Sequence, residues 1–279
     1  MVPVELVWAV DRLSLYNQLE EANCDDTFAL RGMLWFIITG HVTPGHIFVD
    51  DWPKFTHACC LHTTQVDWTG RRSVVMCYVE ERISDLAEHT LHDSNGRKGK
   101  FWKSQPMRHY TTLERKNFEK YMESRKHKPL KMTPGLWLDQ LKPDEARLVA
   151  EQWPYEVPDK EAMFRWLITI LPSACVRDPQ GKPVAWALLY TFSAGGAAYV
   201  LPEYRGKHLV EAYAGQLTTF TLRTCPTQRF FWILDDNVAS QRQVERTSLD
   251  LRRTDMFVHW LAYTPPERTA SGAVGKAKL

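Results

Sequence analysis

The sequence has 279 residues, 44% hydrophobic and 24% charged, which is enough for one large or two ordinary domains with a sizeable core. This composition excludes a wholly disordered chain, and no run reaches the roughly 18 apolar residues of a membrane span. The formal net charge of +2 indicates no particular partner. The six cysteines show neither C-x-x-C nor zinc spacing, which fits free thiols in a reducing compartment.

The first 80 residues predict one helix followed by strands. Residues 8–22 have helical spacing, with an apolar stripe formed by Trp8, Leu13, Tyr16 and Leu19. Residues 30–38 read as a buried strand or hairpin arm, and β-rich runs follow at 47–49, 57–61 and 73–79. Scattered histidines (His41, His46, His57 and His62) lack nearby carboxylate or thiol spacing, so no metal site is predicted.

Residues 95–131 form a basic segment, with 12 Lys or Arg against three acids. One interpretation is a footprint for nucleic acid, anionic lipid or the phosphates of a cofactor. The favoured one is a solvated helix face, since Lys116, Glu119, Lys120 and Glu123 permit ion pairs three and four residues apart.

Two prolines and a glycine between 128 and 135 mark the predicted domain boundary. The sequence thus divides into domains 1–131 and 136–265, with a small-residue tail at 266–279 expected to be flexible. The second domain predicts helices at 143–153 and 159–170, then a hairpin of strands 174–177 and 184–190. A continuation strand at 197–200, a helix from 209, a strand at 230–234 and a helix from Asn237 follow.

The segment from Leu201 to Leu217 is predicted to pass from a strand, through a basic turn, into a helix. Unpaired N–H groups and the positive end of the helix dipole favour anions at such a start. Arg205 and Lys207 add positive charge, and Gly206 permits close approach. Neither the dinucleotide nor the P-loop fingerprint is present, so an ordinary solvated helix start remains the alternative.

These residues resemble motif A of the GNAT acyltransferases, and more closely the glycine N-acyltransferase family. Other fragments of that family's pattern occur in the same order. They are the Val-Asp-x-Trp-Pro-x-Phe-like run at 48–55, the Phe…Leu-Pro run at 164–172, Gly-Lys-Pro-Val-Ala-Trp at 181–186, and the Asn-containing segment at 236–241. The resemblance implies an α/β protein with a mixed sheet, built from tandem GNAT-like halves.

The resemblance also implies that the C-terminal half binds acyl-CoA as a cosubstrate, with no permanently bound cofactor. Backbone groups of Tyr199, Val200 and Leu201 would pair with the pantetheine arm. The pyrophosphate would lie on backbone N–H groups of Arg205, Gly206, Lys207, His208, Leu209 and Val210. Asn237 would either bond the cofactor or cap the next helix.

Three positions depart from the pattern. The family's general base falls on Ala194, and no carboxylate occurs from 184 to 202, so Asp235 and Asp236 are the candidate stand-ins. The position of the tyrosine that protonates the leaving thiolate is occupied by Glu245, for which an exposed helix residue is the favoured alternative. His208 replaces the second glycine of motif A.

The expected function is transfer of an acyl group from acyl-CoA to the amine of a small acceptor, such as glycine or another amino acid. The alternatives are a catalytically weakened acyl-CoA-binding protein and, with less support, a nucleic-acid-associated protein. The resemblance implies a mitochondrial protein, although the acidic start is a poor presequence; the alternative is the cytoplasm. Oligomeric state is left open.

Overall fold

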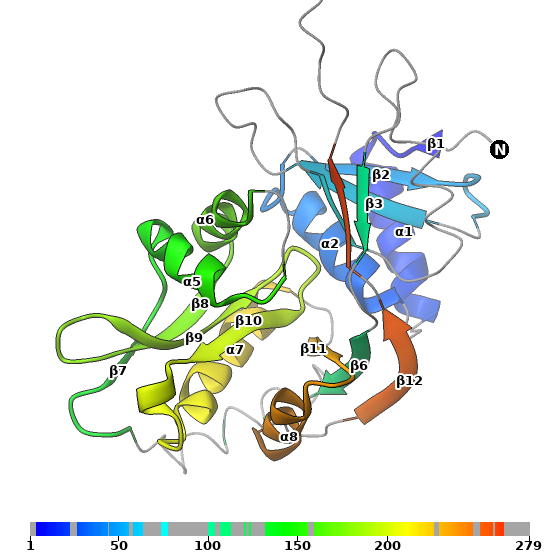
Figure 1. The fold of residues 1–279 in the computed structure, drawn as a ribbon. Helices are drawn as coiled ribbons and strands as arrows, with labels where there is room; N and C mark the ends of the chain where they lie inside the picture. Colours follow the sequence, from blue (N-terminus) through cyan, green and yellow to red (C-terminus); the bar gives the residue numbers. More distant parts are fainter. Residues whose placement is uncertain are drawn as a thin grey trace, which may run out of the picture.

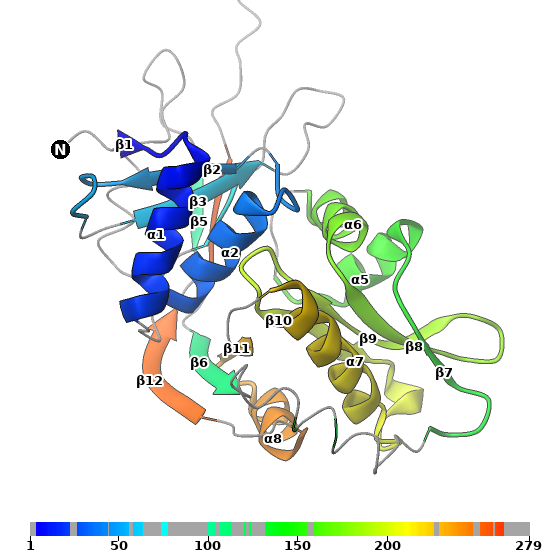
Figure 2. The ribbon, with the colours of Figure 1, turned by 180° about the vertical axis from the view of Figure 1, so that it is seen from behind.

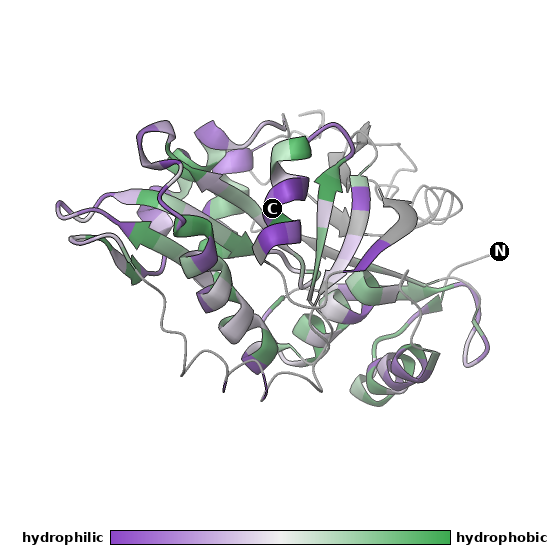
Figure 3. Cartoon of the chain, turned by 90° about the horizontal axis from the view of Figure 1, so that it is seen from below, coloured by the Kyte–Doolittle hydropathy of each residue, from purple (hydrophilic) through white to green (hydrophobic). Residues whose placement is uncertain are grey.

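A computed structural model describes residues 4–22, 27–43, 45–55, 58–63, 74–77, 100–103, 107–112, 120, 123, 132–155, 159–225, 229–247, 252–258 and 260–264 (Figure 1). These residues form helices packed on antiparallel sheets, which confirms the predicted α/β class. The expected tail at 266–279 and most of the basic segment at 95–131 lie outside the described residues. In Figure 3, hydrophobic colour is concentrated in the strands, while most helices carry both colours, as expected where amphipathic helices cover sheets.

The N-terminal half is a six-stranded sheet with helices α1 (Ala9–Ala22) and α2 (Phe28–Ile38) on one face (Figure 2). Its strands lie in the order β1-β2-β3-β4-β13-β5. They comprise β1 (Val4–Glu5), β2 (Gly45–Val49), β3 (Ala58–Thr63), β4 (Val74–Cys77), β5 (Lys100–Lys103) and β13 (Trp260–Thr264). The predicted strand runs at 47–49, 57–61 and 73–79 therefore correspond to β2, β3 and β4.

The strand predicted for residues 30–38 is wrong, because this run is helix α2. Nine of its eleven residues are buried, including Arg31 and Gly32, so the helix is buried on nearly all sides. Such a run has no period that separates a buried helix from a buried strand.

The first predicted helix is confirmed as α1, but part of its predicted stripe is wrong. Helix α1 buries Leu15, Tyr16 and Leu19. Trp8 is 73% exposed and Leu13 is 45% exposed. The buried face is narrower than the predicted one, because α2 covers a single side of this helix.

The C-terminal half contains a four-stranded sheet in the order β10-β9-β8-β7, with α7 on one face and α5 and α6 on the other (Figures 1 and 2). The predicted 174–177/184–190 hairpin is confirmed, because β8 pairs antiparallel with β9. The next strand turns back on β9 as a second hairpin rather than continuing it. The strands are β7 (Trp137–Asp139), β8 (Ser173–Arg177), β9 (Pro183–Leu189) and β10 (Gly195–Val200). The helices are α5 (Ala146–Gln152), α6 (Lys160–Ile170) and α7 (Leu209–Thr224), with single 3-10 turns η3 (Pro143–Glu145) and η4 (Pro202–Tyr204).

A third sheet joins the two halves. It has the order β11-β6-β12, formed by β11 (Arg229–Leu234), β6 (Met107–Thr112) and β12 (Arg252–Val258). Strand β6 thus precedes the predicted boundary but pairs with two strands that follow it. In return, β13 pairs with β4 and β5 of the N-terminal sheet. The ranges 1–131 and 136–265 remain a prediction for domains, and their strands are interleaved.

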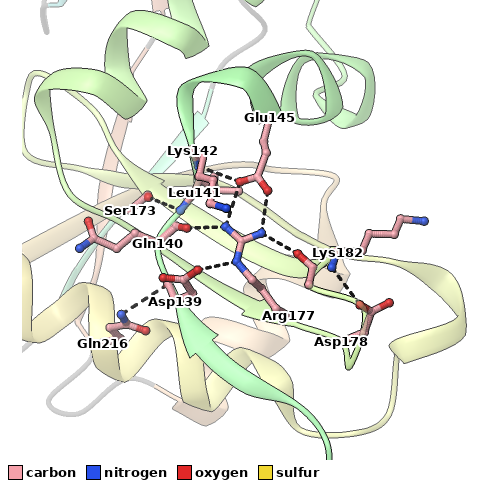
Figure 4. Close-up of polar contacts among 11 residues, drawn as sticks. Asp139, Gln140, Leu141, Lys142, Glu145, Ser173, Arg177, Asp178, Lys182 and Gln216 are labelled. Atoms are coloured by element: carbon pink, nitrogen blue, oxygen red, sulfur yellow. Dashed lines mark hydrogen bonds and ion pairs between the residues drawn. The ribbon is translucent and has the colours of Figure 1, made fainter.

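A buried arginine ties together the edge of the four-stranded sheet (Figure 4). The Arg177 guanidinium donates to the carboxylates of Asp139 and Glu145 and to the carbonyl oxygens of Gln140 and Gly181. Its side chain is 3% exposed. These contacts join β7, η3 and the β8–β9 turn, so the charge is fully hydrogen-bonded where it is removed from water.

Candidate functional site

A cavity of about 750 Å³ lies between β10 and β11, which belong to different sheets. Its lining comes from both strands, the start of α7, one side of α8 (Val238–Thr247) and the segment after α5. Two neighbouring strands that part in this way leave backbone groups facing a ligand space. The cavity is therefore a slot between these two strands, with α7 along it.

Strand β10 is irregular where it lines the slot. Its pairing with β9 shifts between Gly196 and Tyr199, and Ala197 has a φ of 46°. The Leu201 N–H donates to the carbonyl of Val184 at 2.9 Å, so this N–H is used inside the sheet. Because bonding alternates along an antiparallel strand, Val200 directs its N–H and carbonyl away from β9. Of the three predicted arm-binding residues, Val200 is thus the one whose backbone is turned outward.

The basic turn leads from β10 into α7 as predicted. Gly206 has a φ of 76° and His208 a φ of 57°, so both lie in the left-handed region. A glycine adopts this conformation without penalty, whereas a histidine does so at some cost in strain. Helix α7 starts at Leu209 and has no side-chain hydrogen bond at its N-cap. Leu209 and Val210 of its first turn line the cavity, and N–H groups at a helix start have no partner within the helix, which suits an anion.

Two cations flank this helix start. Arg205 lies 5.6 Å from the ring centre of Tyr199, and its Nε donates to the Val200 carbonyl at 3.2 Å. Lys207 Nζ lies 4.5 Å from the ring centre of Tyr204. Both side chains are exposed. A phosphate held on α7 would be within the region these cations can reach, and Arg205 would exchange its Val200 contact for it.

The other end of the cavity is aromatic. Trp153 packs edge-on against Tyr155 with ring centres 4.8 Å apart, and Phe192 stacks on both Tyr190 (5.1 Å) and Trp232 (4.7 Å). Burial raises the pKa of Tyr155 to about 12 and raises the pKa of Tyr190. The Tyr155 hydroxyl donates to Met107 Sδ at 3.8 Å.

The predicted proton-handling residues lie next to lining residues but are not themselves part of the lining. Among the described residues that line it, Glu211 is the carboxylate, and it lies at the start of α7 3.5 Å from His208. Asp235, Asp236 and Glu245 are exposed and are absent from the lining. The first of these pairs with Arg108 at 3.0 Å. Asp236 contributes, after burial, to the raised pKa of Tyr155 in the lining, and the catalytic role of all three carboxylates stays a prediction.

Ala194, at the family's base position, is buried in the turn between β9 and β10 and lines the cavity. Its carbonyl accepts the N–H of Tyr190 at 2.9 Å. The family's base position therefore faces the cavity, but its side chain here is a methyl group, which cannot accept a proton.

Asn237 caps α8 and also lines the cavity. Its side-chain oxygen accepts the N–H of Ser240 at 3.1 Å, which caps α8. It also lines the cavity, together with Ser240 and Gln243 from the same helix. The cap is thus present, and a bond to a cofactor stays a prediction.

The sequence did not indicate the aromatic end of the site. Trp153, Tyr155, Tyr190, Phe192 and Trp232 come from three separate segments with no common spacing. Large aromatic residues are common core residues, so none stood out as a ligand contact. Within the described residues, no group of three or more His, Cys, Asp or Glu side chains could hold a metal ion. In the same part of the chain, we find no helix with the length and hydropathy to cross a membrane.

No protein-family model matches the chain. Among solved structures, a Drosophila protein overlays with a TM-score of 0.65 at 13% identity, over 95% of this chain and 99% of that one. The two chains therefore share a fold over nearly their full lengths. A tandem GNAT protein from the clavulanic acid biosynthesis pathway gives a TM-score of 0.45 at 12% identity, covering 95% and 100% of the two chains. A putative GNAT-family acetyltransferase from Novosphingobium aromaticivorans gives 0.42 at 12% identity, covering 71% and 75%.

Proposed function

We propose that this protein is a GNAT-type N-acyltransferase that moves an acyl group from acyl-CoA to the amine of a small acceptor. The resemblance to the glycine N-acyltransferase family makes glycine or another amino acid the first acceptor to test, and a mitochondrial location the first compartment. One observation carries the proposal. The parted strands, the outward backbone of Val200 and the open start of α7 all meet in one cavity.

This arrangement suits a long ligand with a phosphate end and an extended arm. The pyrophosphate takes the N–H groups at the start of α7, with Arg205 and Lys207 beside it. The arm runs along β10 and bonds Val200 as an added strand would. The thioester then lies toward Ala194 and the aromatic end, where the amine can meet it.

In the reaction, the amine nitrogen attacks the thioester carbonyl, the C–N bond forms and the C–S bond breaks. The amine loses a proton and the departing thiolate gains one. Holding the two reactants in one slot supplies a large part of the rate. The missing base at Ala194 removes a contribution of about 10²–10⁴-fold, so we expect modest turnover.

The absence of a carboxylate at Ala194 favours a second function, an acyl-CoA-binding protein with weak or no turnover. The two are separated by measuring thiol release. Short-chain, long-chain, benzoyl and phenylacetyl-CoA are each combined with a panel of amino acids and amines. Calorimetry with CoA measures binding in parallel. Release that depends on the acceptor supports the enzyme, and binding without release supports the second function.

A double variant tests the binding site itself. Arg205→Glu with Lys207→Glu places two negative charges beside the proposed phosphates, and we expect CoA affinity to fall by more than about tenfold, since charge-assisted bonds contribute about 1.5–3 kcal/mol each. Arg147→Glu, an exposed charge change on α5, is the matched control. Equal affinity in the double variant and the control would place CoA elsewhere or exclude it.

A further inference from the structure

Strands β10 and β11 part along the slot, yet one side chain spans them at the aromatic end. Phe192 is in the β9–β10 turn and is 1% exposed. Its ring stacks on Tyr190 from its own hairpin and on Trp232 from β11, at 5.1 and 4.7 Å between ring centres. It also lies 6.4 Å from the ring of Phe230 on β11. Phe192 therefore occupies the space between the two walls where the slot ends.

The turn that carries Phe192 is held from outside by the N-terminal half. A Cβ at Gly32 of α2 would come within 2.3 Å of Ser193 Oγ and 2.5 Å of the Phe192 carbonyl oxygen. Both distances are closer than real Cβ atoms come. Helix α2 thus touches the turn through its backbone, and Gly32 is the residue that allows this approach.

The turn is closely packed around this contact. Ser193 already has a φ of 65°, is fully buried, and donates its N–H to the Tyr190 carbonyl at 2.9 Å. Beside this contact, Phe28 of α2 stacks on Phe230 of β11 at 6.2 Å. Helix α2 hence packs on both walls, the hairpin turn and β11. Any displacement of the turn is passed to the Phe192 ring, because the backbone atoms in contact with Gly32 belong to Phe192 itself.

We propose that Phe192 sets the size of the group that fits at the end of the slot, and that Gly32 positions it from the N-terminal half. This inference rests on the proposed function. With the pyrophosphate at the start of α7 and the arm along β10, the group beyond the thioester extends toward Phe192. A buried aromatic ring in contact with both walls leaves no empty volume there, since protein interiors are close-packed.

The test compares Phe192→Ala and Phe192→Leu with the wild type, using acyl-CoA thioesters of increasing chain length. Removal of the ring opens space, so we expect the preferred chain to lengthen. The ratio of kcat/KM for a long chain over a short one should rise about tenfold or more, the range for one methylene group in an apolar pocket. The Leu variant should show a smaller shift in the same direction.

Gly32→Ala tests the positioning role. The added methyl group displaces the turn and Phe192 with it, so the chain-length ratio should also change. The control is Trp35→Phe, which weakens α2 elsewhere by removing the 3.0 Å bond from Trp35 Nε1 to the Thr224 carbonyl. Thermal melting of each variant separates loss of folding from altered preference. A changed ratio in Gly32→Ala but not in Trp35→Phe supports positioning, and equal ratios in both contradict it.

Binding provides a readout that does not require turnover. Affinities for unreactive thioether analogues of the same chain lengths are measured by calorimetry, with CoA alone as the reference. For Phe192→Ala and Phe192→Leu, we expect an unchanged affinity for CoA and a changed dependence of analogue affinity on chain length. If the wild type turns over no substrate while the analogues show this shift, the proposed enzyme activity fails and this inference stands. If Phe192→Ala leaves the chain-length dependence of turnover and binding unchanged, the inference is overturned.

Discussion

Arg177→Met should destabilise the protein strongly, although this residue is outside the cavity lining. The substitution keeps much of the volume and removes a charge that donates to two carboxylates and two carbonyl oxygens. Glu145 is 16% exposed, so its carboxylate would remain largely buried beside unpaired carbonyl groups. Removing one partner of a buried pair costs about 3–5 kcal/mol. Asp139 is 44% exposed and can be rehydrated, so we expect the lower end of that range.

The assay is urea unfolding followed by far-UV circular dichroism, with thermal melting as a second measure. A loss of about 3 kcal/mol corresponds to a fall in Tm of about 6–12 °C for a chain of this size class. Arg177→Lys keeps the charge but loses the planar fork, so it should be intermediate. The control Arg147→Ala breaks an exposed pair and should leave the unfolding midpoint close to that of the wild type. A loss for Arg177→Met as small as the control would refute the reasoning.

Two further predictions concern charge. The hydrogen bond from Arg177 holds the pKa of Asp139 below its usual value, so this pair stabilises the fold above the ordinary carboxyl pKa and stops doing so as pH falls through the lowered pKa. In unfolding experiments from pH 6 to pH 2, the free energy of unfolding of Asp139→Asn should therefore depend less steeply on pH than that of the wild type. An unchanged slope would contradict this. Glu211→Gln removes the carboxylate at the start of α7. CoA should then bind about two- to fivefold tighter, because a charge at a helix end contributes about 0.3–1 kcal/mol. Calorimetry checks this, and weaker binding would mean that Glu211 does not face the phosphates.

Local signals in the sequence predicted much of the C-terminal half. The turn residues 178–182 between two apolar runs predicted the β8–β9 hairpin, and the basic turn before Leu209 predicted the start of α7. Each of these features is decided within about ten residues of chain. Helix α2 was missed because its burial on nearly all sides erases the period from which a helix is recognised.

The aromatic end of the site could not be predicted in the same way. Trp153 follows α5, Phe192 lies in a hairpin turn and Trp232 lies in β11. What brings them together is the parting of β10 from β11, a property of sheet pairing over long sequence distances. The place of the proton-handling positions relative to the cavity is likewise set by long-range packing. Counting from Asn237 leads to Glu245, whereas α8 turns Ser240 and Gln243 to the cavity and leaves Glu245 outside the lining.

Because strands of the two halves are interleaved, the N-terminal half contacts both walls of the slot directly. Strand β6 forms a ladder with β11, one wall of the cavity, and α2 packs on the turn that forms the other wall. Neither wall is therefore built from the segment 136–265 alone. A truncated protein that begins at residue 136 would lose β6 and α2 together, exposing one edge of β11 and the buried turn at Ser193. The N-terminal half is thus part of the site's structure, which is the physical reason that a substitution at Gly32 can alter a preference expressed at Phe192.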